Sequence, residues 1–173
     1  YSRVGGHYVE LTGGEPLVHQ KISELVRLAC GPSRHVTVCT NGLRLERILS
    51  ELRSGCVQLV KLSLHATANS SDAEWLLGPG WDFERVSENI SRVIDIGTRI
   101  QLLYTLTQRN AVALPKLLDL ALKWGVDLQL VDLIRSRNKD SAPSLGYLGG
   151  EVFEEYVRPR AHFERIVSDR TGA

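Results

Sequence analysis

The sequence predicts an α/β fold built on a parallel sheet, and two observations lead to that prediction. Short apolar segments, most of them rich in β-branched residues, alternate with segments whose apolar residues recur every three to four positions. Each of the periodic segments ends close to a glycine, as helices commonly do. A strand–helix unit repeated five times favours parallel strands joined by right-handed crossovers.

Five apolar segments are expected to form the strands. They are residues 8–11, 36–40, 59–64, 100–106 and 128–134. The last three are almost continuously apolar, which predicts burial on both faces of the sheet.

Four segments between and after these strands have the apolar stripe of an amphipathic helix. The stripes are Ile22, Leu25, Val26 and Ala29; then Leu45, Ile48, Leu49 and Leu52; then Phe83, Val86, Ile90, Val93 and Ile94; and then Leu114, Leu117, Leu118, Ala121 and Leu122. The expected stop signals are Gly31-Pro32, Gly55, Gly97 and Gly125. Asp82 is expected to cap the third helix.

The composition changes after residue 135. Residues 136–150 are rich in Ser, Asn, Pro and Gly, as in a linker, and apolar residues at helical spacing follow from Val152 to Val167. We therefore expect a core at residues 1–135, followed at 136–173 by a linker and a C-terminal helical extension.

Composition and charge exclude several classes of protein. The 173 residues are 43% apolar and carry a formal net charge of +1, which favours a globular protein and argues against nucleic acid or a membrane as partner. No apolar run approaches the roughly 20 residues of a membrane helix, and no segment resembles a signal peptide. We expect a cytoplasmic protein. Its three cysteines, Cys30, Cys39 and Cys56, suggest small buried residues rather than a disulfide framework or a metal site.

Polar residues and glycines gather where the expected strands end, which is where ligands bind to parallel sheets. The first strand is followed by Thr12-Gly13-Gly14-Glu15-Pro16. The later strands end in Thr40-Asn41-Gly42, in Ser63-Leu64-His65-Ala66, in Thr105-Leu106-Thr107-Gln108-Arg109-Asn110 and in Asp132-Leu133-Ile134. Glycine lets the backbone approach a ligand, and a carboxylate accepts hydrogen bonds from an ammonium group.

Each of these residues also has a structural alternative. Asn41-Gly42 is a common turn pair, Ser63 could be a small packing residue, and His65 could be a structural hydrogen-bonding group. Glu15 could cap the following helix, and Asp132 could pair with Arg135 or Arg137.

The succession T-G-G-E-P, T-N-G, S-L-H-A, Y-T-L-T-Q-R-N and L-Q-L-V-D-L-I resembles the radical SAM superfamily. Within it, the chain looks most like the core of GTP 3′,8-cyclase, from molybdenum cofactor synthesis, and its peptide-modifying relatives. The resemblance covers residues 8–134. It implies a (β/α)6-like partial barrel lacking its first strand unit. The implied activity uses S-adenosylmethionine and a [4Fe–4S] cluster to generate a 5′-deoxyadenosyl radical, which abstracts hydrogen from a substrate.

The resemblance also assigns roles to residues. The expected cofactor-binding residues are Thr12, Gly13, Gly14, Glu15, Thr40, Asn41, Ser63 and Ile134. The expected substrate-pocket residues are Glu10, Cys39, His65, Gln101, Thr105, Thr107 and Asp132. The expected partners are a small-molecule or peptide substrate and an electron donor such as flavodoxin or ferredoxin.

The chain departs from the family pattern in three respects. It has no C-x3-C-x2-C motif, so the cluster ligands are expected upstream of residue 1. Glu10 and Gln101 stand where the GTP enzyme has basic residues, and the C-terminal cysteines that hold its second cluster are absent. A carboxylate at Glu10 would repel a triphosphate. The sequence therefore predicts a substrate other than GTP.

Two other functions compete with this interpretation. A relative without the cluster could serve as a binding or scaffold protein. A barrel enzyme acting on a phosphorylated metabolite would need a late phosphate-binding loop, for which Gly149-Gly150 is a poor candidate because it lies beyond the last strand. An unpaired edge at the first strand also predicts a dimer, unless the C-terminal helix covers that edge.

Overall fold

The computed structural model describes residues 7–69, 73–74, 77–106 and 110–132. The strands are β1 (Tyr8–Leu11), β2 (His35–Thr40), β3 (Leu59–Ser63), β4 (Arg99–Leu106) and β5 (Asp127–Asp132). The helices are α1 (Ile22–Ala29), α2 (Leu49–Arg53), α4 (Phe83–Ile96) and α5 (Leu114–Trp124). Three short 3-10 helices join them, η1 (Pro16–Val18), η2 (Leu45–Ile48) and η3 (Ala111–Ala113).

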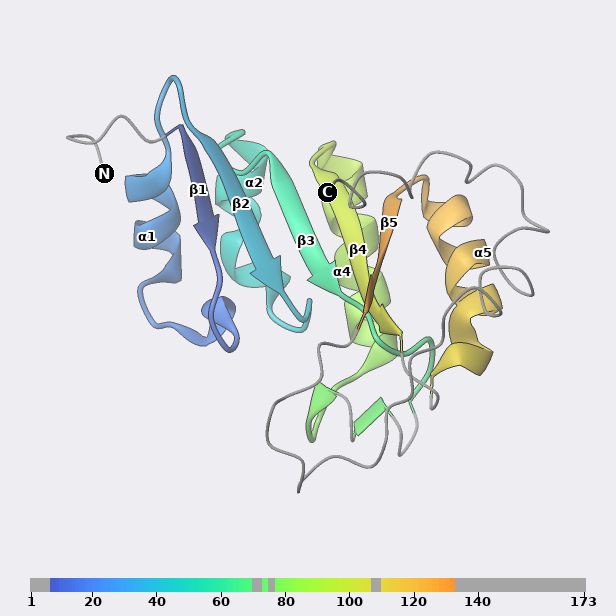
Figure 1. The fold of residues 1–173 in the computed structure, drawn as a ribbon. Coiled ribbons are helices and arrows are strands. Elements are labelled where there is room, and N and C mark those ends of the chain that lie inside the picture. Colours follow the sequence, from blue (N-terminus) through green and yellow to red (C-terminus); the bar gives the residue numbers. More distant parts are fainter. Residues whose placement is uncertain (1–6, 70–72, 75–76, 107–109, 133–173) are drawn as a thin grey trace, which may run out of the picture.

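The five strands form one sheet in the order β1-β2-β3-β4-β5, and every neighbouring pair is parallel. Strands that follow one another in sequence and in space, with right-handed crossovers, place their helices on the same side of the sheet. Accordingly α1 packs beside α2 and α2 beside α4, with α5 next to β5 (Figure 1). The predicted parallel α/β fold is confirmed.

The hydrophobic core lies between the sheet and its helices. Val38, Leu62 and Leu102, one from each central strand, are fully buried and face the helices. The predicted apolar stripes largely supply the other half of this core, but Leu25 and Leu122 are 38% and 53% exposed. Those two residues lie at the margins of their stripes, so the helices turn them away from the sheet.

The other face of the sheet carries no helix in the described part of the chain, and we call it the inner face. Alternation along the strands and the pairing register assign side chains to it. Those on its central part are Glu10, Thr37, Cys39, Leu59, Lys61, Ser63, Gln101, Leu103 and Thr105. All but Glu10 and Thr37 are half-buried. The predicted burial of the last three strands on both faces is therefore wrong, because only the helix side is fully covered.

The element ends agree with the predicted caps in most places. Asp82 accepts hydrogen bonds from the backbone N–H of Glu84 and Arg85 and so caps α4. Gly97 and Gly125 end α4 and α5 in the left-handed conformation. The first helix instead ends at Cys30, whose backbone is extended. The predicted linker and C-terminal extension lie outside the described residues.

Cys30 and Cys56 form a disulfide, which corrects the expectation that the cysteines are isolated buried thiols. Cys30 follows α1 and Cys56 follows α2, and the packing of these helices brings the two Cα atoms to 5.2 Å. A separation of 26 residues in sequence gives no sign of this contact. Cys39 remains a free thiol.

Strand β1 forms one edge of the sheet and pairs only with β2 among the described strands. Tyr8, on this edge, is 77% exposed. None of the described helices has the length and apolar character needed to cross a membrane.

Substituting two glycines that have the same positive φ should separate backbone strain from steric crowding. Gly42 and Gly97 both have φ of +84°, but a Cβ at Gly42 would lie 3.0 Å from Leu62 Cδ1 and 3.1 Å from Val86 Cγ1. A Cβ at Gly97 would meet none of the described residues within 4 Å. Gly97→Ala should cost about 1–2 kcal/mol from the left-handed backbone alone. Gly42→Ala should cost about 1–3 kcal/mol more through overpacking. Chemical denaturation measures both free energies of unfolding, and equal losses would contradict this packing.

Candidate cofactor and substrate site

The bend after β1 is open to solvent. Thr12, Gly13 and Gly14 are exposed, and Gly13 has φ of +145°, which favours glycine. A Cβ on Gly13 or Gly14 would meet no atom of the described residues within 4 Å. Steric crowding by the described residues therefore does not explain why glycines occupy these two positions. A ligand could approach the backbone here.

Glu15 holds this bend against the end of β2. Its Oε1 accepts hydrogen bonds from Leu17 N at 2.9 Å and from Thr40 Oγ1 at 2.8 Å, and its Oε2 accepts one from Asn41 N at 2.7 Å. The contact with Leu17 confirms the capping alternative, since Glu15 is the N-cap of η1. The structure thus brings together four predicted cofactor-binding residues, Gly14, Glu15, Thr40 and Asn41.

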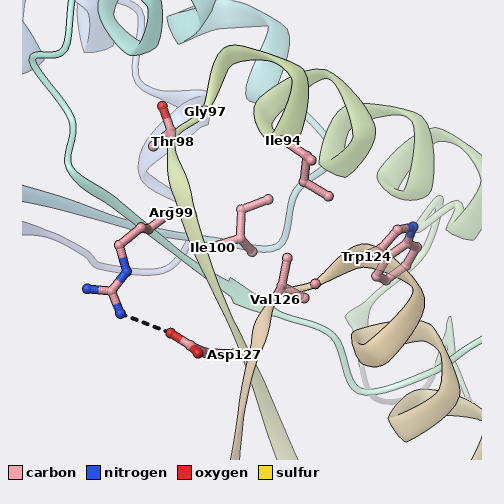
Figure 2. A pocket seen from close by; sticks show the side chains of 9 residues that line it. Ile94, Gly97, Thr98, Arg99, Ile100, Trp124, Val126 and Asp127 are labelled. Atoms are coloured by element: carbon pink, nitrogen blue, oxygen red, sulfur yellow. Dashed lines mark hydrogen bonds and ion pairs between the residues drawn. The ribbon is translucent and has the colours of Figure 1, made fainter.

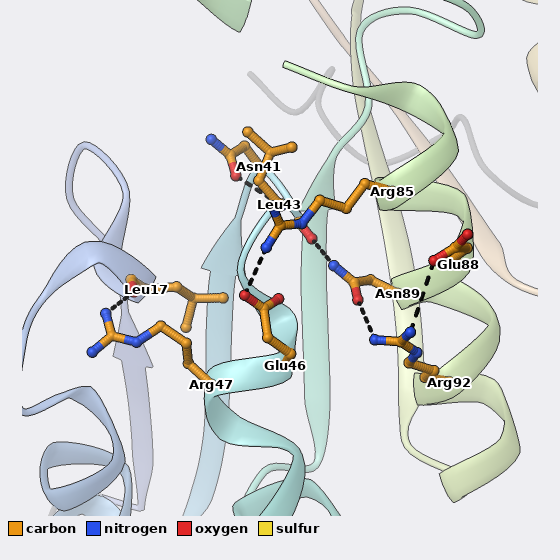
Figure 3. Close-up of polar contacts among 10 residues, drawn as sticks. Leu17, Asn41, Leu43, Glu46, Arg47, Arg85, Glu88, Asn89 and Arg92 are labelled. Atoms are coloured by element: carbon orange, nitrogen blue, oxygen red, sulfur yellow. Dashed lines mark hydrogen bonds and ion pairs between the residues drawn. The ribbon is translucent and has the colours of Figure 1, made fainter. Parts of the chain in front are cut away.

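The Asn41-Gly42 pair forms a tight turn beside the bend, as the structural alternative held. Asn41 Oδ1 accepts from Leu43 N at 3.1 Å, and Thr40 Oγ1 accepts from Gly42 N at 3.1 Å. From α4, the buried Asn89 donates to the carbonyl oxygen of Gly42 at 2.9 Å (Figure 3). The helix layer therefore fixes the position of this turn. It also fixes the backbone N–H of Asn41, which donates a hydrogen bond to Glu15.

A second polar cluster joins the carboxyl ends of β3 and β4. His65 Nδ1 accepts from Thr105 N at 3.1 Å, and Asn110 Nδ2 donates to the carbonyl oxygens of Thr105, at 2.9 Å, and His65, at 3.3 Å. The Tyr104 hydroxyl donates to the carbonyl oxygen of Asn110 at 2.6 Å. His65 therefore has the structural role named as its alternative. Asn110, the last residue of the polar segment expected after the fourth strand, holds His65 and Thr105 together, a role that the sequence analysis did not assign to it.

Burial sets the protonation of this cluster. It lowers the pKa of His65 below 6.5 and raises the pKa of Tyr104. A neutral His65 whose Nδ1 accepts a hydrogen bond carries its proton on Nε2. The ring can thus donate a hydrogen bond while remaining uncharged.

Three side chains, one each from β1, β2 and β3, meet on the inner face. Glu10 Oε2 lies 2.7 Å from Lys61 Nζ, and the Cys39 thiol donates to Glu10 Oε1 at 3.2 Å. In the register of β3 and β4, Gln101 lies beside Lys61 and Leu103 beside Ser63. Glu10, Cys39, Ser63, Gln101 and Thr105, all predicted site residues, therefore share one face of the sheet.

Lys61 was missed by the sequence analysis, although a lysine within an otherwise apolar strand was a usable signal. Its hydrogen bond to Glu10 raises the pKa of Lys61, and hydrogen bonds from Lys61 and Cys39 lower the pKa of Glu10. Burial and the contact with Glu10 raise the pKa of Cys39 to about 11, so the thiol stays protonated at neutral pH. Glu10 is thus neutralised by its partner, and the argument that it alone repels a triphosphate is incomplete.

The remaining predicted site residues are only partly covered by the structure. Thr107 and Ile134 lie outside the described residues. Asp132 is described through its backbone alone, at the end of β5 and in register with Leu106.

The described residues include no group of three or more His, Cys, Asp or Glu side chains arranged to hold a metal ion. Of the three cysteines of the chain, two form the disulfide and the third donates to Glu10. The cysteines present therefore do not fit the ligand set of a [4Fe–4S] cluster.

A hollow of about 310 Å³ lies at the amino ends of β4 and β5 (Figure 2). The glycine bend lies at the carboxyl ends of the strands. Ile94, Ile100 and Trp124 line its apolar part. The two charged residues at its rim pair with each other, Arg99 Nη2 lying 3.0 Å from Asp127 Oδ2. The hollow is thus separate from the glycine bend.

Comparison with known proteins decides the family. The model of the radical SAM superfamily matches residues 1–121. The chain belongs to the radical SAM superfamily.

Similar proteins include curated sequences and solved structures. A protein of Saccharolobus islandicus described as a probable GTP 3′,8-cyclase is 33% identical over 129 residues, covering 72% of this chain and 41% of that protein. Two solved structures share this fold at 17% sequence identity. SuiB of Streptococcus suis bound to S-adenosylmethionine matches with a TM-score of 0.62, over 76% of this chain and 31% of SuiB. A domain of a pyruvate-formate lyase-activating enzyme of Bacteroides vulgatus matches with a TM-score of 0.63, over 88% of this chain and 92% of that domain. Enzymes of this superfamily use S-adenosylmethionine and a [4Fe–4S] cluster.

The buried His65 should make stability depend on pH. Its pKa is lowered in the folded state, so the unfolded chain binds a proton more readily as the pH falls through 6.5. The stabilising contribution is complete above pH 6.5 and is lost below it, by at most about 1.4 kcal/mol per pH unit. His65→Gln, which keeps an acceptor for Thr105 N, should lose less stability between pH 7.5 and pH 5.5 than the wild type.

The control for this prediction is His19→Gln. His19 is exposed, and its Nδ1 also accepts a backbone N–H, from Lys21 at 3.1 Å. Its variant should keep the wild-type difference in unfolding free energy between the two pH values. If His65→Gln also kept that difference, the claim that His65 is buried in its neutral form would be refuted.

Proposed function

We propose that the chain is the core of a radical SAM enzyme and that it binds S-adenosylmethionine at the glycine bend after β1. The carrying observation is that the bend at Gly13 and Gly14 is exposed and uncrowded by the described residues, next to a carboxylate fixed against β2. The carboxyl edge of a parallel sheet is the expected place for such a ligand.

The residues of the bend suit the amino-acid end of the cofactor. Backbone carbonyl groups near Gly13 and Gly14 can accept hydrogen bonds from its ammonium group, and Glu15 adds a negative charge. Thr40, Asn41 and Ser63 would border the same ligand, and we retain Ile134 as a contact on the adenine side. Bound beside a reduced cluster, S-adenosylmethionine would supply the radical chemistry of hydrogen abstraction, and these residues would hold its amino-acid end.

The cluster ligands belong, in this proposal, to a part of the protein outside this chain. The chain spans 41% of the length of the curated relative described above, and its own cysteines do not fit a cluster. What the described residues supply is the cofactor bend and the inner face that would hold the substrate.

Substrate and partners follow as further parts of the proposal. A solved structure of SuiB contains its precursor peptide SuiA, which supports a small-molecule or peptide substrate here. We propose a flavodoxin or ferredoxin as electron donor, and a dimer through the free edge of β1. Thr107 and Asp132 remain proposed pocket residues.

We also propose a cytoplasmic location. Low-potential electron donors of this kind work inside the cell and so favour it. The Cys30–Cys56 disulfide argues against it, because disulfides persist mainly in oxidising compartments.

Anaerobic reconstitution of the full-length protein with iron and sulfide tests the proposal. We expect absorbance typical of a [4Fe–4S] cluster and reductive cleavage of S-adenosylmethionine to 5′-deoxyadenosine. A protein that neither acquires a cluster nor cleaves the cofactor would instead be a cluster-less binding or scaffold protein.

A pair of glycine variants locates the cofactor. Gly14→Leu should leave folding intact, because Gly14 is exposed and a Cβ there would meet none of the described residues within 4 Å, but should weaken S-adenosylmethionine binding at least tenfold by occupying the ligand space. Gly31→Leu is the control. Gly31 lies before the amino end of β2, away from the bend, and a Cβ there would make only ordinary van der Waals contacts with the Arg34 side chain. Equilibrium dialysis of the reconstituted protein measures both. Equal affinities for the two variants would exclude the bend as the site.

A further inference from the structure

The inner face is electrically balanced by ion pairs. Glu10 pairs with Lys61 at 2.7 Å, and Arg99 pairs with Asp127 at 3.0 Å nearer the amino ends of the strands. Among the described residues, these four are the Asp, Glu, Lys and Arg side chains that the register assigns to this face. Every one of them therefore has an oppositely charged partner.

The Glu10–Lys61 pair reaches across this face from the edge strand β1 to the central strand β3, and it is accessible. The side chains of Glu10 and Lys61 are 46% and 28% exposed. Glu10 stands three residues before Gly13, a distance of about 10 Å along an extended chain. A substrate lying over the inner face next to a cofactor at the bend would contact this pair.

The remaining groups around the pair are uncharged. Cys39 is a protonated thiol, and Gln101 and Thr105 offer amide and hydroxyl groups. A polyanion such as a nucleoside triphosphate is normally held by several unpaired cations. Lys61, the cation nearest the centre of the face, is already engaged by Glu10.

The pair nevertheless keeps hydrogen-bonding capacity on both sides. A lysine ammonium has three N–H donors and a carboxylate about four acceptor positions. Lys61 gives one donor to Glu10, and Glu10 accepts from Lys61 and Cys39. A ligand with a donor next to an acceptor can engage both residues at once. A purely anionic ligand has no donor for Glu10, and the Lys61 charge that would attract it is already balanced by Glu10.

We propose that Glu10 and Lys61 select a substrate bearing a paired donor and acceptor, the α-amino and carboxyl or amide groups of a peptide or amino acid, and reject polyanionic nucleotides. This deepens the proposed function and rests on it, because it assumes that the inner face holds the substrate. Lys61 is the specificity-determining residue that the pair adds to the site.

Titration of the intact ¹⁵N-labelled protein, followed by NMR, tests the proposal with triglycine, glycine and inorganic tripolyphosphate as probes. Triglycine should shift the signals of Glu10, Cys39 and Lys61, and tripolyphosphate should not. Lys61→Gln should abolish the triglycine shifts, and Lys61→Arg should restore them. Shifts by glycine as large as those by triglycine would assign the site to a free amino acid; larger shifts by triglycine would assign it to a peptide.

A second test removes the negative charge of Glu10 and so leaves Lys61 without its ion-pair partner. Glu10→Gln should tighten tripolyphosphate binding about tenfold or more, because Lys61 then becomes an unpaired cation. Glu46→Gln is the matched control, since it frees Arg85 from a 2.9 Å ion pair between η2 and α4, away from the inner face. Its tripolyphosphate affinity should equal that of the wild type.

Two results would overturn the proposal. One is stronger binding of tripolyphosphate than of triglycine at the inner face of the wild type, and the other is the absence of triglycine shifts at Lys61. Addition of S-adenosylmethionine to the same sample, read at the Gly13 and Gly14 signals, reports separately on the proposed function. Shifts there without triglycine shifts at Lys61 would refute the substrate class alone.

Discussion

The carboxylate of Glu15 is the interaction on which the site depends. Its three hydrogen bonds reach η1 through Leu17 and the end of β2 through Thr40 and Asn41. Charge-assisted hydrogen bonds of this kind are stronger than those between neutral groups. They hold an exposed glycine bend in place without placing any side chain in the space beside Gly13 and Gly14. The same carboxylate can therefore order the loop and contribute negative charge to a cationic ligand.

The rest of the fold supports this contact from behind. Asn89 on α4 donates a hydrogen bond to Gly42. Gly42 directly follows Asn41, whose backbone N–H donates to Glu15. A side chain at Gly42 would crowd Leu62 and Val86. The hydrophobic layer between the sheet and α4 is thus connected, through one turn, to the ligand edge. The inner face lies on the other side of the sheet, where ion pairs rather than apolar packing set its character.

Much of this was predictable from sequence. Alternating periodicities gave five strands within two residues of their observed ends as far as the structure describes them, and the parallel sheet followed from the repeat. The T-G-G-E-P and T-N-G motifs correctly indicated neighbouring loops. Three features were not predictable. The Cys30–Cys56 disulfide depends on helix packing, the half-open inner face depends on which side the helices occupy, and the pairing of Glu10 with Lys61 joins residues 51 positions apart across an intervening strand. Each is set by tertiary register, which local sequence patterns do not contain.

A structure of the full-length protein with S-adenosylmethionine bound tests the central claim most directly. The quantity to measure is the distance from the methionine amino nitrogen to the nearest backbone carbonyl oxygen between Thr12 and Gly14. We expect a hydrogen-bond distance of about 2.7–3.2 Å, with the contacts of Glu15 to Thr40 and Asn41 retained. A cofactor bound elsewhere, with the glycine bend still open to solvent, would contradict the account.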